Sequence, residues 1–170
     1  MRKIFIAATK QNDGKTTASL GLMSNFKDRF RKVAFIKPIG QRYLEEDGVK
    51  VDEDSILIEK VCGFHCTLKD MSPIAVEKGF TEKYIANPDK RSITAQIKNA
   101  YERIYKGQDM GIIEGKGHAG VGSVFDHSNA SVAKLLGAKV IIISSGGIGR
   151  PIDEIILNKA LFDREGVKVL

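Results

Sequence analysis

The sequence contains no tryptophan, only four prolines and only two cysteines. Because two cysteines cannot build a disulfide framework, we interpret Cys62 and Cys66 as reduced thiols. No apolar run approaches the roughly 18–20 residues that span a bilayer. The apolar stretch 4–8 is also shorter than the core of a signal peptide, which takes about 7–15 residues. These absences predict a cytoplasmic protein that has no membrane partner.

The chain has a basic charge balance: 27 lysines and arginines stand against 21 acidic residues, a formal net charge of +6. This balance suits an anionic ligand, but no clustered basic stripe indicates nucleic acid, and we expect none to bind. A length of 170 residues fits one domain. Seventeen glycines beside so few prolines indicate tight loops in which the backbone comes close to a ligand.

Short apolar strands alternate with helical patterns along the chain. We expect strands at 3–8, 33–37, 109–114, 139–144 and 166–170, and helices from about residue 15 to 30 and at 53–62, 92–107, 128–137 and 152–164. Residues 41–55 are predicted to be an exposed loop, and 64–92 a loop with some helix. The alternation predicts an α/β fold with a mostly parallel central sheet flanked by helices. Because the last strand stops abruptly, we expect 1–170 to be a single domain that lacks its C-terminal part.

The segment TKQNDGKTT, residues 9–17, follows the first strand and opens the first helix. This is the setting of a phosphate-binding P-loop, in which backbone N–H groups at a helix N-terminus surround the phosphates. Gly14 would let the backbone approach, Lys15 would reach the β- and γ-phosphates, and Thr16 would bind Mg²⁺. The usual pattern has a glycine five residues before Gly14, and in this sequence that position is Thr9.

Three further residues of this loop, Asn12, Asp13 and Thr17, complete the predicted nucleotide-binding segment. Lys10 stands five residues before Lys15, as does the second lysine of a deviant Walker A loop, which contacts phosphates and often does so across a dimer. The alternative is that Lys10 is an ordinary solvated loop lysine.

Carboxylates for Mg²⁺ are expected near the ends of strands. Glu114 ends the strand 109–114, where an unused buried charge would be costly. Asp52 and Asp54 precede a predicted helix, and the residues alone do not choose between them. Lys37 ends the second strand, on the sheet edge where α/β proteins bind ligands.

Two glycine-rich or cysteine-bearing segments raise further hypotheses. Gly115, Gly117 and His118 belong to a loop whose open backbone N–H groups fit a substrate; the alternative is that His118 packs on its neighbours. The segment CGFHC, residues 62–66, suggests a metal site, but structural Zn²⁺ needs four ligands and no second pair exists.

In this order, the segments TKQNDGKTT, FIKPIG, DEDS, IIEGKGHAG and IIISSGGIGRP resemble the dethiobiotin synthetase and cobyrinic acid a,c-diamide synthase superfamily of P-loop proteins. The resemblance is closest to the dethiobiotin-synthetase-like N-terminal domain of long phosphate acetyltransferases. It implies ATP and Mg²⁺ as cofactors and Lys15 and Lys37 as catalytic residues. It also implies Thr16, Asp54 and Glu114 as Mg²⁺ ligands, Asp54 being chosen because Ser-Ile-Leu follows it.

The resemblance implies an ATP-dependent ligase-like protein that activates a carboxylate or carbamate by phosphoryl transfer, takes a small carboxylate or amine substrate, and forms a homodimer. One alternative is a non-catalytic, nucleotide-sensing regulatory domain, and another is a ParA/MinD-like switch ATPase. After Lys37 the sequence reads Pro-Ile-Gly-Gln, where dethiobiotin synthetases have a small polar stretch. We therefore expect no dethiobiotin synthesis. In the family that the sequence resembles, the asparagine that reads the base lies on a continuation of the last strand beyond residue 170, so we also expect nucleotide binding with loose base selectivity.

Overall fold

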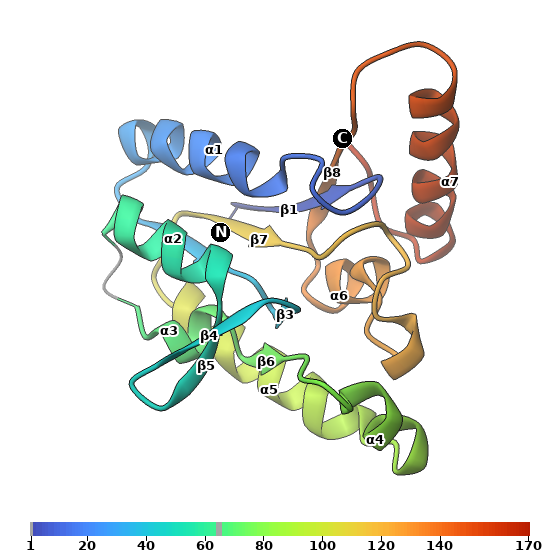
Figure 1. Cartoon of the computed structure of the whole chain (residues 1–170). Helices are drawn as coiled ribbons and strands as arrows, with labels where there is room; N and C mark the ends of the chain where they lie inside the picture. Colours follow the sequence, from blue (N-terminus) through green and yellow to red (C-terminus); the bar gives the residue numbers. More distant parts are fainter. Residues whose placement is uncertain (1, 64–65) are drawn as a thin grey trace.

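The computed structural model describes residues 2–63 and 66–170, and at its centre lies a four-stranded sheet (Figure 1). Its strands are β1 (Arg2–Ala8), β2 (Val33–Ile36), β7 (Met110–Glu114) and β8 (Lys139–Ile143). All neighbouring pairs are parallel, in the order β2-β7-β1-β8. The predicted parallel α/β fold is confirmed, because β7, most of β2 and the second half of β1 are buried as parallel strands covered by helices require, whereas β8 at the sheet edge is mostly half-buried.

Helices cover both faces of the sheet. Figure 1 shows α1 on one side of the strands and α5 and α6 on the other. The helices are α1 (Lys15–Arg29), α2 (Glu53–Cys62), α3 (Leu68–Met71), α4 (Phe80–Ala86), α5 (Lys90–Tyr105), α6 (Asn129–Leu135) and α7 (Arg150–Arg164), with a 3₁₀ turn, η1 (Ser123–Phe125). None of the helices within the described ranges is long and apolar enough to cross a bilayer.

Helix α5 shows the predicted apolar stripe but begins earlier than expected. The stripe is fully buried and consists of Ile93, Ile97, Ala100 and Ile104. The sequence places the N-cap at Ser92, which is wrong. The helix begins at Lys90, because the Asp89 side chain accepts a hydrogen bond from the Ser92 backbone N–H at 2.9 Å and so caps the first turn.

Residues 41–55 are not the exposed loop that their polarity predicts. They contain the antiparallel hairpin of β4 (Tyr43–Glu46) and β5 (Val49–Asp52). Asp47 and Gly48 form its turn with φ of 50° and 73°. Two consecutive positive φ values give the turn whose twist matches paired strands, and Asp-Gly is a sequence that favours it. A second small pair, β3 (Ile39–Gly40) with β6 (Ile74–Ala75), adds a strand to the segment 64–92.

The last expected strand, 166–170, is reduced to a single bridge. Val169 bridges Val140 of β8 in parallel, with a hydrogen bond of 2.9 Å on each side. The chain therefore touches the sheet edge without forming a strand of its own. The extent of the domain remains a prediction.

The cysteine-bearing segment lies partly outside the described residues, which exclude 64 and 65. Cys62 and Cys66 carry free thiols. Within residues 2–63 and 66–170, no group of three or more His, Cys, Asp or Glu side chains could hold a metal ion by itself.

The parallel sheet brings four loops to one edge. Because all four strands run the same way, the segments that follow β1, β2, β7 and β8 leave at their shared carboxyl end. Three of these segments carry the residues that the sequence singles out, at 9–17, 37–42 and 114–118. This edge is where open α/β sheets bind ligands.

Candidate functional site

The Asp13 side chain stabilises the loop between β1 and α1 through hydrogen bonds to the first residues of that loop. The Thr9 hydroxyl donates to Asp13 Oδ2 at 2.7 Å, and the Lys10 backbone N–H donates to the same oxygen at 3.0 Å. Asn12 and Gly14 have positive φ, 66° and 88°, and turn the chain into the helix. Thr9 thus takes the place of the missing glycine as a hydrogen-bonding member of the loop. Asp13 supports the loop and does not line the cavity beside it.

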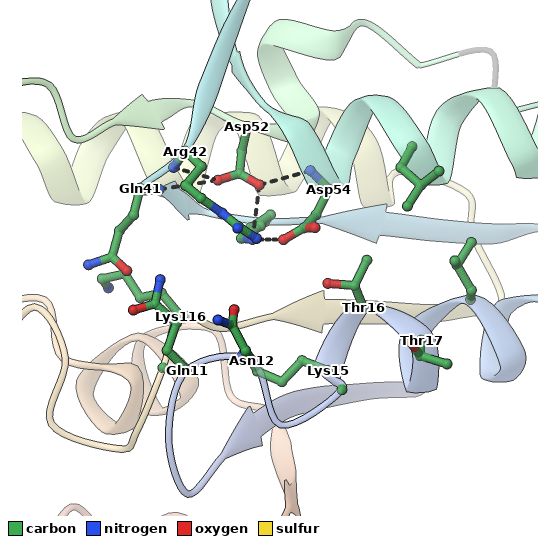
Figure 2. A pocket seen from close by; sticks show the side chains of 15 residues that line it. Gln11, Asn12, Lys15, Thr16, Thr17, Gln41, Arg42, Asp52, Asp54 and Lys116 are labelled. Carbon is green, nitrogen blue, oxygen red and sulfur yellow. Dashed lines mark hydrogen bonds and ion pairs between the residues drawn. The ribbon is translucent and has the colours of Figure 1, made fainter.

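A cavity of about 350 Å³ opens between this loop and the loops after β2 and β7. Figure 2 shows the side chains of the first helix on one wall, and those of the β3–α2 region on the other. Its lining residues are Gln11, Asn12, Gly14, Lys15, Thr16, Thr17, Leu20, Lys37, Gln41, Arg42, Asp52, Asp54, Leu57, Lys116 and Gly117. The cavity therefore collects the P-loop, both predicted catalytic lysines and both candidate aspartates.

Lys37 lies among three carboxylates at the far wall of the cavity. Its Nζ is 2.9 Å from Asp52 Oδ1 and 3.6 Å from Glu114 Oε1, and it forms a close ion pair with Asp54. Burial by itself would lower the pKa of Lys37, but the negative charges of Glu114, Asp52 and Asp54 outweigh it and raise that pKa. Lys37 is therefore a permanently charged group that is buried and fully paired.

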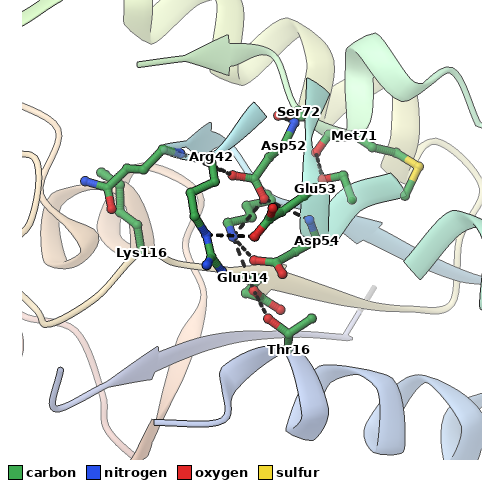
Figure 3. Close-up of polar contacts among 12 residues, drawn as sticks. Thr16, Arg42, Asp52, Glu53, Asp54, Met71, Ser72, Glu114 and Lys116 are labelled. Carbon is green, nitrogen blue, oxygen red and sulfur yellow. Dashed lines mark hydrogen bonds and ion pairs between the residues drawn. The ribbon is translucent and has the colours of Figure 1, made fainter. Parts of the chain in front are cut away.

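The two candidate aspartates have different surroundings, as Figure 3 shows. Asp52 accepts hydrogen bonds from the backbone N–H groups of Gln41 (3.1 Å) and Asp54 (3.1 Å), and so belongs to the protein framework. Asp54 pairs through its side chain with Lys37. Burial would raise the pKa of Asp54, but the Lys37 ammonium lowers it below its usual value.

Glu114 is fully buried at the end of β7. Its Oε1 accepts a hydrogen bond from the Thr16 hydroxyl at 3.2 Å, whereas Oε2 is buried without a hydrogen-bond partner among the described residues. Burial raises the pKa of Glu114, and the charge of Lys37 opposes that rise. A hydroxyl and two carboxylates, one of them with an orphaned oxygen, are hard oxygen donors. Thr16, Asp54 and Glu114 therefore fit Mg²⁺, which takes one or two carboxylates together with phosphates.

Lys15 begins helix α1 and is buried. Its ammonium forms an ion pair with none of the carboxylates in the described part of the chain. Burial lowers the pKa of Lys15, and the charge of Glu114 offsets part of that effect. Unlike Lys37, Lys15 is a buried cation that no carboxylate of residues 2–63 and 66–170 contacts. An anion in the cavity would supply one.

The loop after β7 is fixed through Lys116. The Lys116 backbone N–H donates to Asn129 Oδ1 at 3.0 Å, and its Nζ donates to the His127 carbonyl at 3.1 Å. Burial, together with the nearby Lys37 charge, lowers the pKa of Lys116 to about 7. Gly115 fits closely here, since a Cβ would lie 2.6 Å from a Phe5 ring carbon. Gly115 thus packs behind the cavity.

Besides Asp13, Glu114 and Gly115, which do not line this cavity, two further predicted site residues lie away from it. His118 and Lys10 line a separate hollow at the start of α7, together with Arg150. The His118 ring accepts a hydrogen bond from the Gly120 N–H at 3.2 Å, and the Lys10 ammonium lies 3.9 Å from Asp13. The structure does not bring either side chain to Lys15, and their proposed contacts with substrate and phosphate stay predictions.

Sequence reasoning did not single out Gln41, Arg42 or Lys116, which all line the cavity. The turn at Asp47 and Gly48 was the available signal for the first two. A hairpin at this turn pairs Tyr43 with Asp52, and so brings Gln41 and Arg42, which precede its first strand, close to Asp52. Lys116 gave no signal, because a lysine between two glycines reads as solvated.

The fold and the cavity are those of a P-loop NTPase-type domain. The sequence matches the family described as an AAA domain (AAA_26) over residues 2–170, so the chain belongs to that family. A solved structure with this architecture is the kinase domain of the Escherichia coli tyrosine kinase ETK, with a TM-score of 0.54 and 16% identity. The match covers 99% of this chain and 64% of that domain, and it shows the fold alone.

Among curated proteins, the chain is similar to the ATP-dependent dethiobiotin synthetase BioD of Methanococcus vannielii, with 26% identity over 168 residues. That match covers 98% of this chain and 75% of the relative. It is also similar to the phosphate acetyltransferase of Pseudomonas putida, with 26% identity over 145 residues, covering 85% of this chain but 20% of the relative. These relatives confirm the predicted resemblance to dethiobiotin synthetases and to phosphate acetyltransferases, and they support a P-loop ATP-binding domain.

Proposed function

We propose that the chain binds ATP with Mg²⁺ in the cavity and transfers the γ-phosphoryl group to a small carboxylate or carbamate. The observation that carries this proposal is that two buried lysines line the cavity from different elements. Lys15 and Thr16 on α1 lie opposite Asp54 in Figure 2, and the second lysine, Lys37, lines the same cavity and is paired with Asp54. A nucleotide-binding module needs the first wall. A second buried ammonium on the opposite wall favours chemistry on a further anionic group once Mg²⁺ takes Asp54 and Glu114 as ligands and leaves the Lys37 charge less compensated.

The chain's own residues divide the work between them. Lys15 and the backbone N–H groups at the start of α1 would bind the phosphates, since a helix N-terminus favours anions. Thr16, Asp54 and Glu114 would hold Mg²⁺, which neutralises phosphate charge when bound. Lys37 would orient the attacking oxygen and offset the charge that develops during transfer.

The proposed reaction has two steps, a phosphoryl transfer and then the attack of an amine. An oxygen of the substrate carboxylate or carbamate attacks the γ-phosphorus, the bond to the bridging oxygen breaks, and ADP leaves. An amine then attacks the carbon of the resulting mixed anhydride, and inorganic phosphate leaves while the amine loses a proton to the solvent. Holding both reactants in a cavity of about 350 Å³ supplies the orientation that such transfers require.

The second substrate differs, in our proposal, from that of dethiobiotin synthetases. Gln41 and its neighbours follow Lys37 in place of the family's small polar stretch, and the Gln41 N–H is already bonded to Asp52. The test has two parts: calorimetry of MgATP binding, and an assay with diaminopelargonate, bicarbonate and MgATP. We expect binding without dethiobiotin. Dethiobiotin formed near the rate of an ordinary slow enzyme, about 1 s⁻¹, would overturn our view of the substrate.

A regulatory nucleotide-binding domain is the second candidate function. It is favoured by the match to phosphate acetyltransferases, which places the similarity in one fifth of a much longer protein. ATP binding without phosphate release, with a range of small carboxylates and amines, would support it over the ligase-like function. The ParA/MinD-like switch stays a prediction.

We further propose that the domain forms a homodimer in the cytoplasm. The Lys10 side chain is 49% exposed and lies outside the cavity of its own chain. That position fits a contact with a second copy better than a contact with the nucleotide beside it. Sedimentation with and without ATP tests this state, and a monomer under both conditions would contradict it.

A further inference from the structure

The Lys37 ammonium forms ion pairs with three carboxylates, those of Asp52, Asp54 and Glu114. All four side chains are at most 12% exposed, so water screens their charges little. Asp54 and Glu114 are also the carboxylates that fit a divalent cation. The Lys37 ammonium therefore already occupies the position of a cation between them. Figure 3 shows the three carboxylates above Thr16.

Asp52 differs from the other two carboxylates because the backbone fixes it. Its Oδ2 accepts from the N–H groups of Gln41 at 3.1 Å and Arg42 at 3.4 Å, and its Oδ1 accepts from the Asp54 N–H at 3.1 Å. The Asp52 N–H itself donates to the Ser72 hydroxyl at 3.0 Å. With only 1% of its side chain exposed, Asp52 cannot turn toward a ligand without breaking these bonds.

We propose that Lys37 and a divalent cation exchange for Asp54 and Glu114, and that Asp52 is the positioning residue that keeps Lys37 in the cavity during the exchange. This rests on the proposed function, because MgATP drives the exchange. An ammonium and a divalent cation repel each other strongly when both contact the same buried oxygens. Once Asp54 and Glu114 turn to the cation, Asp52 remains as the counterion, and no buried ammonium is left unpaired.

The first test needs no nucleotide. We would titrate the nucleotide-free protein with Mn²⁺ and follow free Mn²⁺ by electron paramagnetic resonance. Lys37→Met should bind Mn²⁺ at least about tenfold more tightly than wild type, since the competing ammonium is gone. The matched control is Lys50→Met, which removes a lysine paired with Glu77 outside the cavity and should change nothing. Unaltered Mn²⁺ affinity in folded Lys37→Met would overturn the exchange.

A second variant guards against misfolding, because Lys37→Met leaves three buried carboxylates without a counterion. The double variant Lys37→Met with Asp52→Asn removes one charge of each sign and keeps Asp54 and Glu114. It should also bind Mn²⁺ at least about tenfold more tightly than wild type. The exchange is overturned if its affinity equals that of wild type.

The second test concerns Asp52 and uses MgADP. Lysine ammonium protons give a ¹⁵N-correlated NMR signal when ion pairing slows their exchange with water. In wild type the Lys37 signal should shift on MgADP binding and persist. In Asp52→Asn it should be present without nucleotide and lost with MgADP. A signal that persists equally in both proteins would overturn the role of Asp52.

Calorimetry of MgADP with both proteins separates the two proposals. If wild type does not bind MgADP, the proposed function fails, and the Mn²⁺ titration still decides whether Lys37 competes with a divalent cation. If MgADP binds and Mn²⁺ affinity is the same in wild type and both Lys37 variants, the exchange fails while nucleotide binding stands.

Discussion

The Thr16 hydroxyl donates a hydrogen bond of 3.2 Å to Glu114 Oε1 and so joins the start of helix α1 to the end of strand β7. If the two residues share a Mg²⁺ ion, Glu114→Gln should remove most of the Mg²⁺ dependence of ATP affinity, because it replaces a charged ligand by a neutral one. Calorimetry of ATP binding with and without Mg²⁺ measures this dependence.

The control for Glu114→Gln is Asp52→Asn. Asp52 is held by backbone N–H groups and not by Thr16, so its neutral variant keeps both proposed carboxylate ligands of Mg²⁺. It should lose only the part of the Mg²⁺ dependence that comes from leaving Lys37 without a counterion, and so less than Glu114→Gln loses. If both variants lost the dependence equally, Glu114 would have no special part in binding the cation. Tight binding of Mg²⁺ by the nucleotide-free wild-type protein would also contradict the site as we describe it.

A second prediction concerns Lys15, the buried ammonium without a carboxylate in contact. Lys15→Ala should weaken ATP binding by at least about 2 kcal/mol, since each charge-assisted hydrogen bond to a phosphate contributes roughly 1.5–3 kcal/mol. Calorimetry at a fixed Mg²⁺ concentration gives the difference. Lys50→Ala removes the same charge outside the cavity and should have little effect. Equal affinities for wild type and Lys15→Ala would refute the P-loop assignment.

Most of the fold could be predicted because apolar runs and glycines mark it. The strands of the central sheet fell within one or two residues of their predicted bounds, since each is a short apolar run between polar loops. The hairpin at 43–52 was missed because β4 is polar without alternation between two faces, and the alternation of Val49 and Val51 with polar residues in β5 is only four residues long. The turn at Asp47 and Gly48 carried a further local signal.

The sequence predicts the residues of the site only where their positions at the ends of parallel strands bring them together. Lys15, Thr16, Lys37 and Glu114 each follow or end a strand of one parallel sheet, so topology alone brings them together. The different surroundings of Asp52 and Asp54 depend on where a tight loop closes, which no residue pattern shows. The burial of Lys116 likewise depends on contacts with a segment eleven residues away.

A third prediction uses two glycines with opposite surroundings. A Cβ on Gly40 would lie 2.5 Å from the Asp52 Cβ, so Gly40→Ala should destabilise the fold by about 1–3 kcal/mol. Gly21 lies in helix α1 with open space around it, and Gly21→Ala should stabilise by about 0.5–1 kcal/mol. Urea unfolding followed by circular dichroism measures both. Equal stability of the two variants would refute the close packing at Asp52.

The last prediction concerns pH and Lys116, whose pKa falls to about 7 in the folded protein from an ordinary value of 10.5. Between these two values the unfolded chain holds a proton on this lysine that the folded chain has released. The free energy of unfolding therefore increases as the pH rises over this interval. Below about pH 7 the lysine is protonated in both states, and this increase is absent.

Lys116→Met removes this titration together with the hydrogen bond to the His127 carbonyl, which is lost equally at every pH. Between pH 7 and 9, the stability of wild type should therefore rise relative to that of Lys116→Met by on the order of 2 kcal/mol. Urea unfolding of both proteins at the two pH values gives the difference. Lys98→Met, at an exposed position of α5, is the control and should follow wild type. A wild-type profile parallel to that of Lys116→Met would show that the Lys116 amine stays protonated in the folded protein.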